Sequence, residues 1–296
     1  MSQTWGDRIF DWINKSVLFF VMIVVLYPII FVVSASISDP QFVNNGTMWL
    51  WPKGITFEGY QRVLDNVEIW TGYRNTILYT IFGTSLNLML TIPCAYALSR
   101  KDLVGRNGIT GIILVTMFIN GGLIPTYLVV KGLHLLNTPL VMIILGGVNV
   151  WNLIVARTFF QSTVPRELEE AAEVDGCSNL RLFMSVVVPI SGPIIAVMAL
   201  FYGVAHWNQY FNALMYLQNR ELFPLQLVLR EILIVNEMSS NMMMDGDSML
   251  AMAEQAKVAD MIKYAIIIIS ALPLLVVFPF VQRFFIKGVL IGSLKG

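Results

Sequence analysis

Long apolar runs dominate this chain and restrict what it can fold into. Apolar residues make up 56% of its 296 residues and charged residues only 13%, whereas soluble domains carry about 25% charged residues. A helix that crosses a bilayer needs about 20 mostly apolar residues. Six stretches meet this requirement, at residues 17–36, 74–98, 109–130, 139–160, 190–211 and 262–285. The sequence therefore predicts an all-α membrane protein with six transmembrane helices.

The distribution of basic residues predicts how these spans are oriented. An even number of spans places both termini on one side of the membrane. The short loop at 99–108 carries Arg100, Lys101 and Arg106, whereas the turn at 131–138 carries only Lys131. Short cytoplasmic loops are enriched in Lys and Arg. We therefore expect a cytoplasmic N-terminus at residues 1–16, a membrane domain at 17–285 and a cytoplasmic tail at 286–296.

The first apolar run also resembles the apolar core of a signal peptide, because Arg8 and Lys15 precede it. That core is usually about 7–15 residues long. The run at 17–36 is longer, so we expect an uncleaved first span.

A charged, helix-prone segment at residues 161–189 interrupts the apolar runs and lies on the cytoplasmic side in this topology. A hydroxyl residue at 162 or 163 can cap a helix that begins near Pro165, since proline suits a first helical position. Asp175 and Gly176 favour a turn, because glycine adopts backbone conformations that other residues resist. Ser178 can cap a second short helix, which Pro189 would end. The expected structure is a helix–turn–helix lying roughly parallel to the membrane.

This segment resembles the Glu-Ala-Ala loop of ABC importer permeases. The pattern is carried here by Glu170, Ala171, Ala172, Gly176, Val186, Val188 and Pro189. The family has Ile or Leu at the two valine positions, which is a mild departure. The triplet alone would fit an amphipathic loop without a partner. The glycine four residues after the triplet and the apolar-x-apolar-Pro ending favour the resemblance.

In that family the loop is the coupling helix, which is seated in a cleft of the cytosolic ATPase subunit. Closure of the ATPase dimer is transmitted through it to the membrane spans. The resemblance therefore implies an ATPase-coupling role for Glu170, Ala171, Ala172, Asp175, Gly176 and Pro189.

Other segments extend the resemblance over most of residues 70–296. They are residues 96–100, 124–127 and 135–138, the Trp-Asn-x-Tyr sequence at 207–210, and the tail at 283–296. They resemble the MalG-like permeases of complex oligosaccharide importers, and most closely the LplC-type group. The resemblance implies a MalG-like ABC importer permease fold with a cytoplasmic coupling helix, located in the cell membrane.

The same resemblance implies partners and no catalysis by this chain. The sequence contains no GxxxxGK[ST] phosphate loop, the motif that cradles nucleotide phosphates. ATP and Mg would therefore be bound by a cytosolic ABC ATPase dimer, and no cofactor by this chain. An extracytoplasmic solute-binding protein would deliver the oligosaccharide, and a second homologous permease subunit would complete the path through the lipid membrane. The net charge of zero indicates no basic face for nucleic acid.

Polar side chains within the spans are candidates for the substrate path, because such residues usually face a bundle interior or a water-filled cavity. These polar residues are Asn87, Asn120, Asn149, Asn152, His206, Asn208 and Gln209. Sugars need amide partners for their hydroxyls and aromatic faces for their rings. The path is expected to include Asn149, Asn152, His206, Trp207, Asn208 and Tyr210. The alternative for each is an interhelical hydrogen bond that holds the bundle together.

Other functions stay open at this point. A permease for a non-sugar solute, such as an amino acid or a peptide, would share the Glu-Ala-Ala segment. An ion-coupled secondary transporter needs ionisable groups inside the membrane, and the predicted spans offer almost none. A membrane-embedded enzyme is disfavoured, because the chain has only two histidines, His134 and His206, and neither an HExxH motif nor paired carboxylates within a span. We therefore expect no metal site.

Overall fold

The computed structural model describes residues 5–242, 261–280 and 282, and this part of the chain contains helices and no strand. The predicted all-α fold is thus confirmed for these residues. The chain divides into two units, which we call the N-terminal unit (Met1–Ile69 with Leu229–Leu272) and the central unit (Trp70–Val228 with Pro273–Gly296). The predicted tail at 286–296 lies outside the described residues, as does the end of the predicted sixth span.

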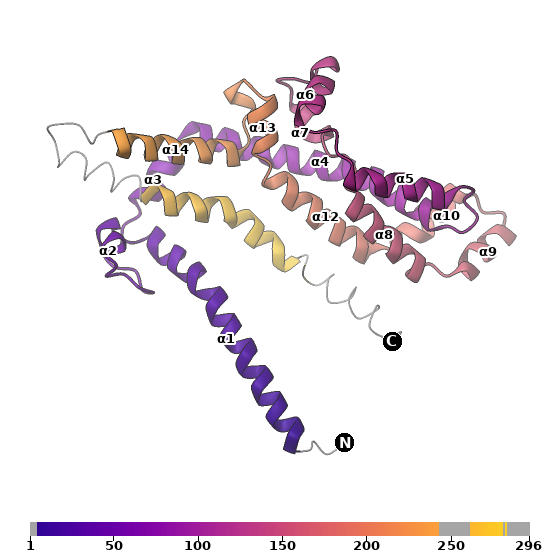
Figure 1. Cartoon of the computed structure of the whole chain (residues 1–296), viewed down its shortest axis with the longest axis horizontal. Coiled ribbons are helices and arrows are strands. Elements are labelled where there is room, and N and C mark those ends of the chain that lie inside the picture. Colours follow the sequence, from indigo (N-terminus) through magenta and orange to yellow (C-terminus); the bar gives the residue numbers. More distant parts are fainter. Residues whose placement is uncertain (1–4, 243–260, 281, 283–296) are drawn as a thin grey trace. The chain divides into compact units, whose positions relative to one another are not determined.

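Three helices are each long and apolar enough to cross a membrane. They are α1 (Trp5–Ser36), α4 (Val67–Ser99) and the helix Met261–Phe280, which Figure 1 draws in yellow without a label. They correspond to the predicted first, second and sixth spans. Helix α1 begins within the predicted N-terminal segment, and α4 extends the predicted span at both ends.

The predicted third and fourth spans are not continuous helices. In place of the third, α5 (Arg106–Phe118) and α6 (Leu123–Gly132) meet at an angle of 111°. Between them the Asn120 side chain accepts a hydrogen bond from the Gly122 N–H at 2.9 Å, which stabilises a turn. In place of the fourth, α7 (Pro139–Ile144) and α8 (Val150–Thr163) are separated by residues 145–149.

The predicted fifth span is also modified. It corresponds to α12 (Gly192–Trp207), which is bent by 80° from the helical segment Asn179–Ile190 before it. That segment consists of α10 (Asn179–Leu182), the π-helical turn η1 (Phe183–Val187) and α11 (Val188–Ile190). Among the described residues there are therefore three candidate spans, or up to five if each bent pair forms one. The expected count of six is not confirmed.

The remaining helices are short, apart from α14. In chain order they are α2 (Pro40–Asn44), α3 (Glu58–Leu64), α9 (Arg166–Val174), α13 (Phe211–Tyr216), the 3-10 turn η2 (Arg220–Leu222) and α14 (Leu225–Met242).

The central unit has an apolar core built from α4, α8, α12 and the segment around η1. Figure 1 shows α4, α5, α8 and α10 close together at one end of this unit. Tyr96 of α4 stacks on Phe183 with ring centroids 5.3 Å apart, and it meets Phe160 of α8 edge-on at 5.7 Å. Such aromatic pairs are worth about 0.5–1.5 kcal/mol each beyond their buried area. We call this region the Tyr96 cluster.

Two arginines satisfy the backbone at the C-terminal end of α4. The last carbonyl groups of a helix have no partner within the helix. Here the Arg157 Nε donates to the Leu98 carbonyl at 2.9 Å. The Arg106 guanidinium donates to the carbonyls of Ser99 and Arg100 at 3.4 and 3.2 Å. The end of α4 is therefore joined to α5 and α8.

Candidate functional site

Helix α9 and the turn after it form the charged segment that the sequence singles out. The helix ends at Val174, and Gly176 follows with a left-handed backbone at φ +68°. The Cys177 N–H donates to the Ala172 carbonyl at 2.9 Å. This is the 6→1 hydrogen bond of a Schellman motif, which commonly ends a helix at glycine. Ser178 then caps α10 by accepting from the Arg181 N–H at 3.4 Å. The predicted turn and second cap are confirmed.

One detail of that prediction is wrong. Ser162 and Thr163 belong to the last turn of α8, so neither of them caps α9. The predicted end of the second helix at Pro189 agrees with the structure to within one residue. The helical segment Asn179–Ile190 ends directly after this proline, and the chain bends by 80° before α12.

The small and acidic residues of α9 fall on two different faces. Leu168 and Ala172, one helical turn apart, pack against the Tyr96 cluster. Glu170 and Ala171 are exposed, and Val174 is 88% exposed. An apolar residue this exposed, beside alanine and a carboxylate, leaves a shallow face onto which another protein can pack closely.

Polar contacts tie α9 and α10 to the end of α4. The Tyr96 hydroxyl donates to the Glu169 carboxylate at 3.3 Å. The Arg100 guanidinium donates to the Asn179 side chain at 3.0 Å and makes a two-fold contact with Asp102, at 2.9 and 2.8 Å. The hydrogen bonds to Asp102 raise the pKa of Arg100 above its ordinary value. Arg100 therefore stays charged, and two-fold pairing of this kind fixes its orientation.

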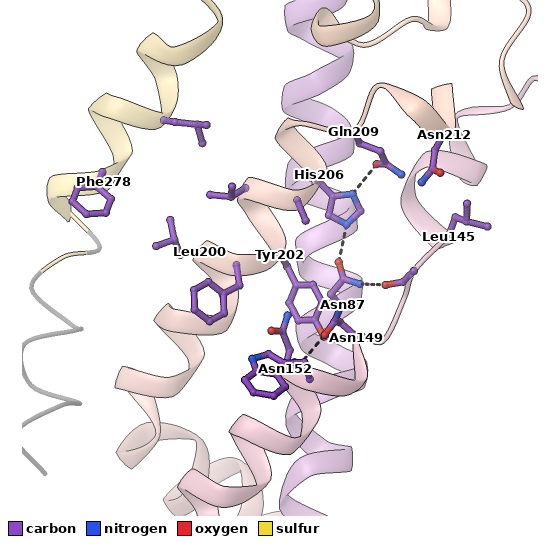
Figure 2. Close-up of a pocket in the computed structure, with 16 residues that line it drawn as sticks. Asn87, Leu145, Asn149, Asn152, Leu200, Tyr202, His206, Gln209, Asn212 and Phe278 are labelled. Carbon is purple, nitrogen blue, oxygen red and sulfur yellow. Dashed lines mark hydrogen bonds between the residues drawn. The ribbon is translucent and has the colours of Figure 1, made fainter. Parts of the chain in front are cut away.

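A second site is a cavity of about 790 Å³ within the central unit. It lies between α4, the α7–α8 break, α12 and the helix Met261–Phe280. Figure 2 shows Gln209 and Asn212 at one end of the view and Asn152 at the other, with Phe278 across from them. In the part of the chain that the structure describes, none of the residues that line the cavity is Asp, Glu, Lys or Arg.

His206 and Asn87 hold one part of the α7–α8 break. The Asn87 amide donates to the carbonyls of Gly146 and Gly147 at 3.0 and 2.8 Å, so its oxygen is left to accept. This oxygen lies 2.7 Å from His206 Nε2, which must carry the proton (Figure 2). In a neutral imidazole Nδ1 is then the acceptor. The Gln209 Oε1 lies 3.2 Å from Nδ1, and a half-turn of the carboxamide brings its N–H group to the same position.

This arrangement depends on the absence of a side chain at Gly83. A Cβ atom there would overlap the His206 ring. The imidazole therefore lies directly against the backbone of α4, where the buried Asn87 is within reach.

Tyr202 holds the other part of the break. Its hydroxyl accepts from the Asn149 N–H at 3.1 Å and lies 2.7 Å from the Thr91 hydroxyl of α4. The Asn149 side chain in turn caps α8 by accepting from the Asn152 N–H at 3.1 Å. Backbone without helical hydrogen bonds is tolerated at membrane depth only where protein or a water-filled cavity surrounds it. Here α4 and α12 supply the hydrogen bonds to the break, and the break borders the cavity.

The structure separates the residues predicted for the substrate path into two groups. Asn149, Asn152 and His206 line the cavity. The others lie outside its lining. Trp207 is buried against Tyr73 with ring centroids 6.2 Å apart. Asn208 donates to the Val204 carbonyl of its own helix at 2.9 Å, and Tyr210 meets Phe211 edge-on.

Four polar residues of the cavity are missing from that prediction. Asn87 and Gln209 were among the wider set of polar candidates, whereas Tyr202 and Asn212 were not. Tyr202 sits in an apolar run, where an aromatic residue is usually interpreted as packing. Asn212 falls one position beyond the predicted fifth span. A usable signal was the spacing of Tyr202, His206 and Gln209, because residues three and four apart share one helix face.

Among the described residues no group of three or more His, Cys, Asp or Glu side chains could hold a metal ion. The chemistry available to the cavity is hydrogen bonding from amides and packing against aromatic rings, in an uncharged lining.

Comparison with known proteins identifies the family. The family model described as binding-protein-dependent transport system inner membrane component matches residues 69–291. The whole chain is 37% identical to Protein LplC of Bacillus subtilis (strain 168), over 98% of that protein. It is 36% identical to the polygalacturonan/rhamnogalacturonan transport system permease protein YtcP of the same organism, over 98% of this chain and 99% of that protein.

A solved structure agrees with these matches. It is described as the crystal structure of a bacterial ABC transporter involved in the import of the acidic polysaccharide alginate. One of its chains is 34% identical to this one, with a TM-score of 0.82 over 96% of this chain and 99% of that chain. The chain therefore belongs to the family of binding-protein-dependent transport system inner membrane components and has the fold of an ABC importer permease.

Proposed function

We propose that this chain is a permease subunit of an ATP-driven, binding-protein-dependent importer of complex oligosaccharides. We further propose that α9 couples ATPase closure to alternating access. The family supports the transport role. The relative YtcP is named for the transport of polygalacturonan and rhamnogalacturonan, and the similar solved structure is described as a transporter involved in the import of alginate. These descriptions support a carbohydrate substrate. ATP and Mg would be bound by the partner ATPase dimer, and a solute-binding protein and a second permease would complete the importer.

The observation that carries the coupling role is the two-faced packing of α9. One face is fixed to the Tyr96 cluster through Leu168 and Ala172. The opposite face leaves Glu170, Ala171 and Val174 exposed. A partner that presses on the exposed face displaces a helix that is already attached to the ends of α4 and α8. Packed interfaces transmit such displacements, because close-packed side chains cannot deform continuously.

The role also requires α9 to lie in the cytoplasm, where an ATPase can reach it. The basic loop at 99–108 supports this orientation. In the structure α9 and this loop belong to one polar network, since Tyr96 contacts both Glu169 and Arg100. We therefore propose that both chain termini, α9 and the end of α4 are cytoplasmic.

The test is reconstitution of the complete importer in proteoliposomes, with uptake and ATP hydrolysis measured in parallel. We expect Glu170→Lys to abolish the stimulation of ATP hydrolysis by loaded binding protein and to lower oligosaccharide uptake at least tenfold. The reason is that the charge at the docking face is reversed. Asp11→Lys, a charge reversal in the predicted cytoplasmic N-terminal segment, serves as the control.

Three outcomes would contradict the proposal. Normal coupling in the Glu170→Lys variant would disprove the role of α9. Uptake driven by an ion gradient without ATPase subunits would disprove the transport class. Uptake of amino acids or peptides in place of oligosaccharides would disprove the substrate class.

A further inference from the structure

We propose that the cavity of the central unit contains a sugar subsite in which the side-chain amides of Asn152, Gln209 and Asn212 bind hydroxyl groups beside the Trp151 indole. The inference rests on the proposed oligosaccharide transport. It divides the polar residues of the cavity into those that hold the fold and those that are available to a ligand.

The Asn152 side chain is the main evidence for a ligand. It lines the cavity and is only 8% exposed. Its backbone N–H is bonded to Asn149, but in the described part of the chain its side-chain amide has no hydrogen-bond partner. Its amide atoms are open to the cavity rather than fully buried. An amide that is unpaired and open to a cavity is suited to a polar group that enters the cavity.

The scaffold residues differ, because their hydrogen-bonding capacity is already used. Asn87 donates to two carbonyls and accepts from His206. Tyr202 is bonded to the Asn149 N–H and to Thr91. These bonds stay within the protein and hold the α7–α8 break. A ligand that competed for these hydrogen bonds would release the break. We therefore assign Asn87 and Tyr202 a positioning role.

Gln209 and Asn212 supply the second point of contact. The Gln209 Oε1 lies 3.2 Å from His206 Nδ1, and the rest of its carboxamide is left for the cavity. The Asn212 side chain lines the same cavity and has no partner in the described residues. In Figure 2 these two residues and Asn152 lie toward opposite ends of the view. An extended chain of sugars suits contacts separated in this way better than a compact solute does.

Aromatic groups complete the subsite. Trp151 precedes Asn152 on α8, lines the cavity and is 61% exposed. Phe201 and Phe278 line the same cavity. Large, rigid rings offer contact area at low entropy cost, and the indole N–H adds a donor. Together with amides they match a sugar ring, which has apolar C–H faces and a polar edge.

The uncharged lining defines what the subsite recognises. Among the described residues no Asp, Glu, Lys or Arg lines the cavity, so none of them supplies a cation there to pair with a carboxylate. A desolvated carboxylate without such a partner is strongly disfavoured. The subsite therefore binds hydroxyls, and any selection for acidic sugars takes place elsewhere in the importer.

The test uses the complete importer in proteoliposomes at saturating binding protein, with matched neutral and uronic-acid-containing oligosaccharides. We expect Asn152→Leu to lower uptake roughly tenfold, the size expected for a lost hydrogen bond. If the wild-type importer takes up the neutral oligosaccharide, the acidic one or both, the uptake of each should fall by this factor. ATP hydrolysis should remain within twofold of wild type. The melting temperature in detergent should stay unchanged, because the Asn152 side-chain amide makes no hydrogen bond to the described residues that the replacement would remove.

Asn107→Leu, an exposed position in α5, is the control and should match wild type in every measurement. Asn212→Leu provides a second, independent variant with the same expected result. Unchanged uptake in both cavity variants would overturn the subsite. Loss of thermal stability in Asn152→Leu would show a structural role instead. A wild-type complex that imports no oligosaccharide would refute the proposed function itself, which is a different result.

Discussion

At the scale of the residue, Gly83 and His206 show how one missing side chain positions a polar group. The imidazole lies where a Cβ at position 83 would be. It can therefore donate to the buried Asn87, which in turn holds the carbonyls of Gly146 and Gly147. A single glycine on α4 thus affects a chain break some sixty positions away in sequence.

We expect Gly83→Ala to lower the stability of the protein by about 1–3 kcal/mol, the usual cost of overpacking. Uptake should fall with it, because the ring must move and Asn87 loses its donor. The measurement is the melting temperature in detergent together with uptake. Gly111→Ala is the matched control, since nothing lies within 4 Å of a Cβ at that position. It should be neutral or stabilising by up to about 1 kcal/mol. Equal effects of the two substitutions would contradict the close contact.

Gly176 is the second residue whose backbone decides its role. Its φ of +68° is left-handed, and a Cβ there would meet open space. The cost of a substitution is therefore conformational, about 1–2 kcal/mol for most residues and less for Asn. We expect uptake to fall in the order wild type, Gly176→Asn, Gly176→Ala, with Gly176→Pro inactive. Full activity of the proline variant would show that the turn after α9 is dispensable.

At the scale of the element, the end of α4 joins α5, α8, α9 and α10. Arg100 lies at its centre, with a side chain that is only 10% exposed and bonds to Asp102 and Asn179. The orientation of α10 relative to α4 therefore depends on one guanidinium group.

We expect Arg100→Gln to weaken coupling, with severalfold less uptake for each ATP hydrolysed, because α10 loses its polar contact with the end of α4. Lys101→Gln, at the exposed neighbouring position, should leave this ratio unchanged. The pKa of Arg100 is raised by Asp102. For a base, stabilisation of this kind is present below the ordinary pKa and is lost only at still more alkaline pH. The difference between variant and wild type should therefore be constant from about pH 6 to 9. A ratio that matches wild type would exclude Arg100 from coupling.

At the scale of the whole molecule, the orientation in the membrane decides which surfaces meet which partners. We predict that α9 is cytoplasmic and that residues 37–73 are outside. In a background in which Cys94 and Cys177 are replaced by Ser, Trp51→Cys should react with a membrane-impermeant maleimide on intact cells. Val174→Cys should react only in inside-out vesicles stripped of the ATPase, which would otherwise cover this face. Both positions are more than 80% exposed, so burial does not limit labelling. The reverse pattern would invert the topology.

Several features of the fold could be predicted from local sequence because their causes are local. Apolar runs of sufficient length identify α1, α4 and the helix Met261–Phe280. The turn after α9 follows from Gly176, and the start of α10 follows from Ser178. Each of these depends on a few neighbouring residues, so no distant contact is needed to predict it.

Other features could not be predicted in this way. An apolar run indicates burial in lipid or protein but not whether the helix continues, so the breaks in the third and fourth segments were not expected. The break at 145–149 is stable because Asn87 and Tyr202, from two other helices, satisfy its backbone. No local pattern contains that information.

By itself the sequence determined that this chain is a helical membrane protein, that its family is that of ABC importer permeases, and where its Glu-Ala-Ala segment lies. These properties follow from hydrophobic length and from a contiguous motif. Only the tertiary structure decided that Ala172 faces inward while Ala171 faces outward. It also separated Asn152 from the satisfied polar residues around it. Which groups are already paired depends on contacts between residues far apart in the chain, and these exist only once the helices pack.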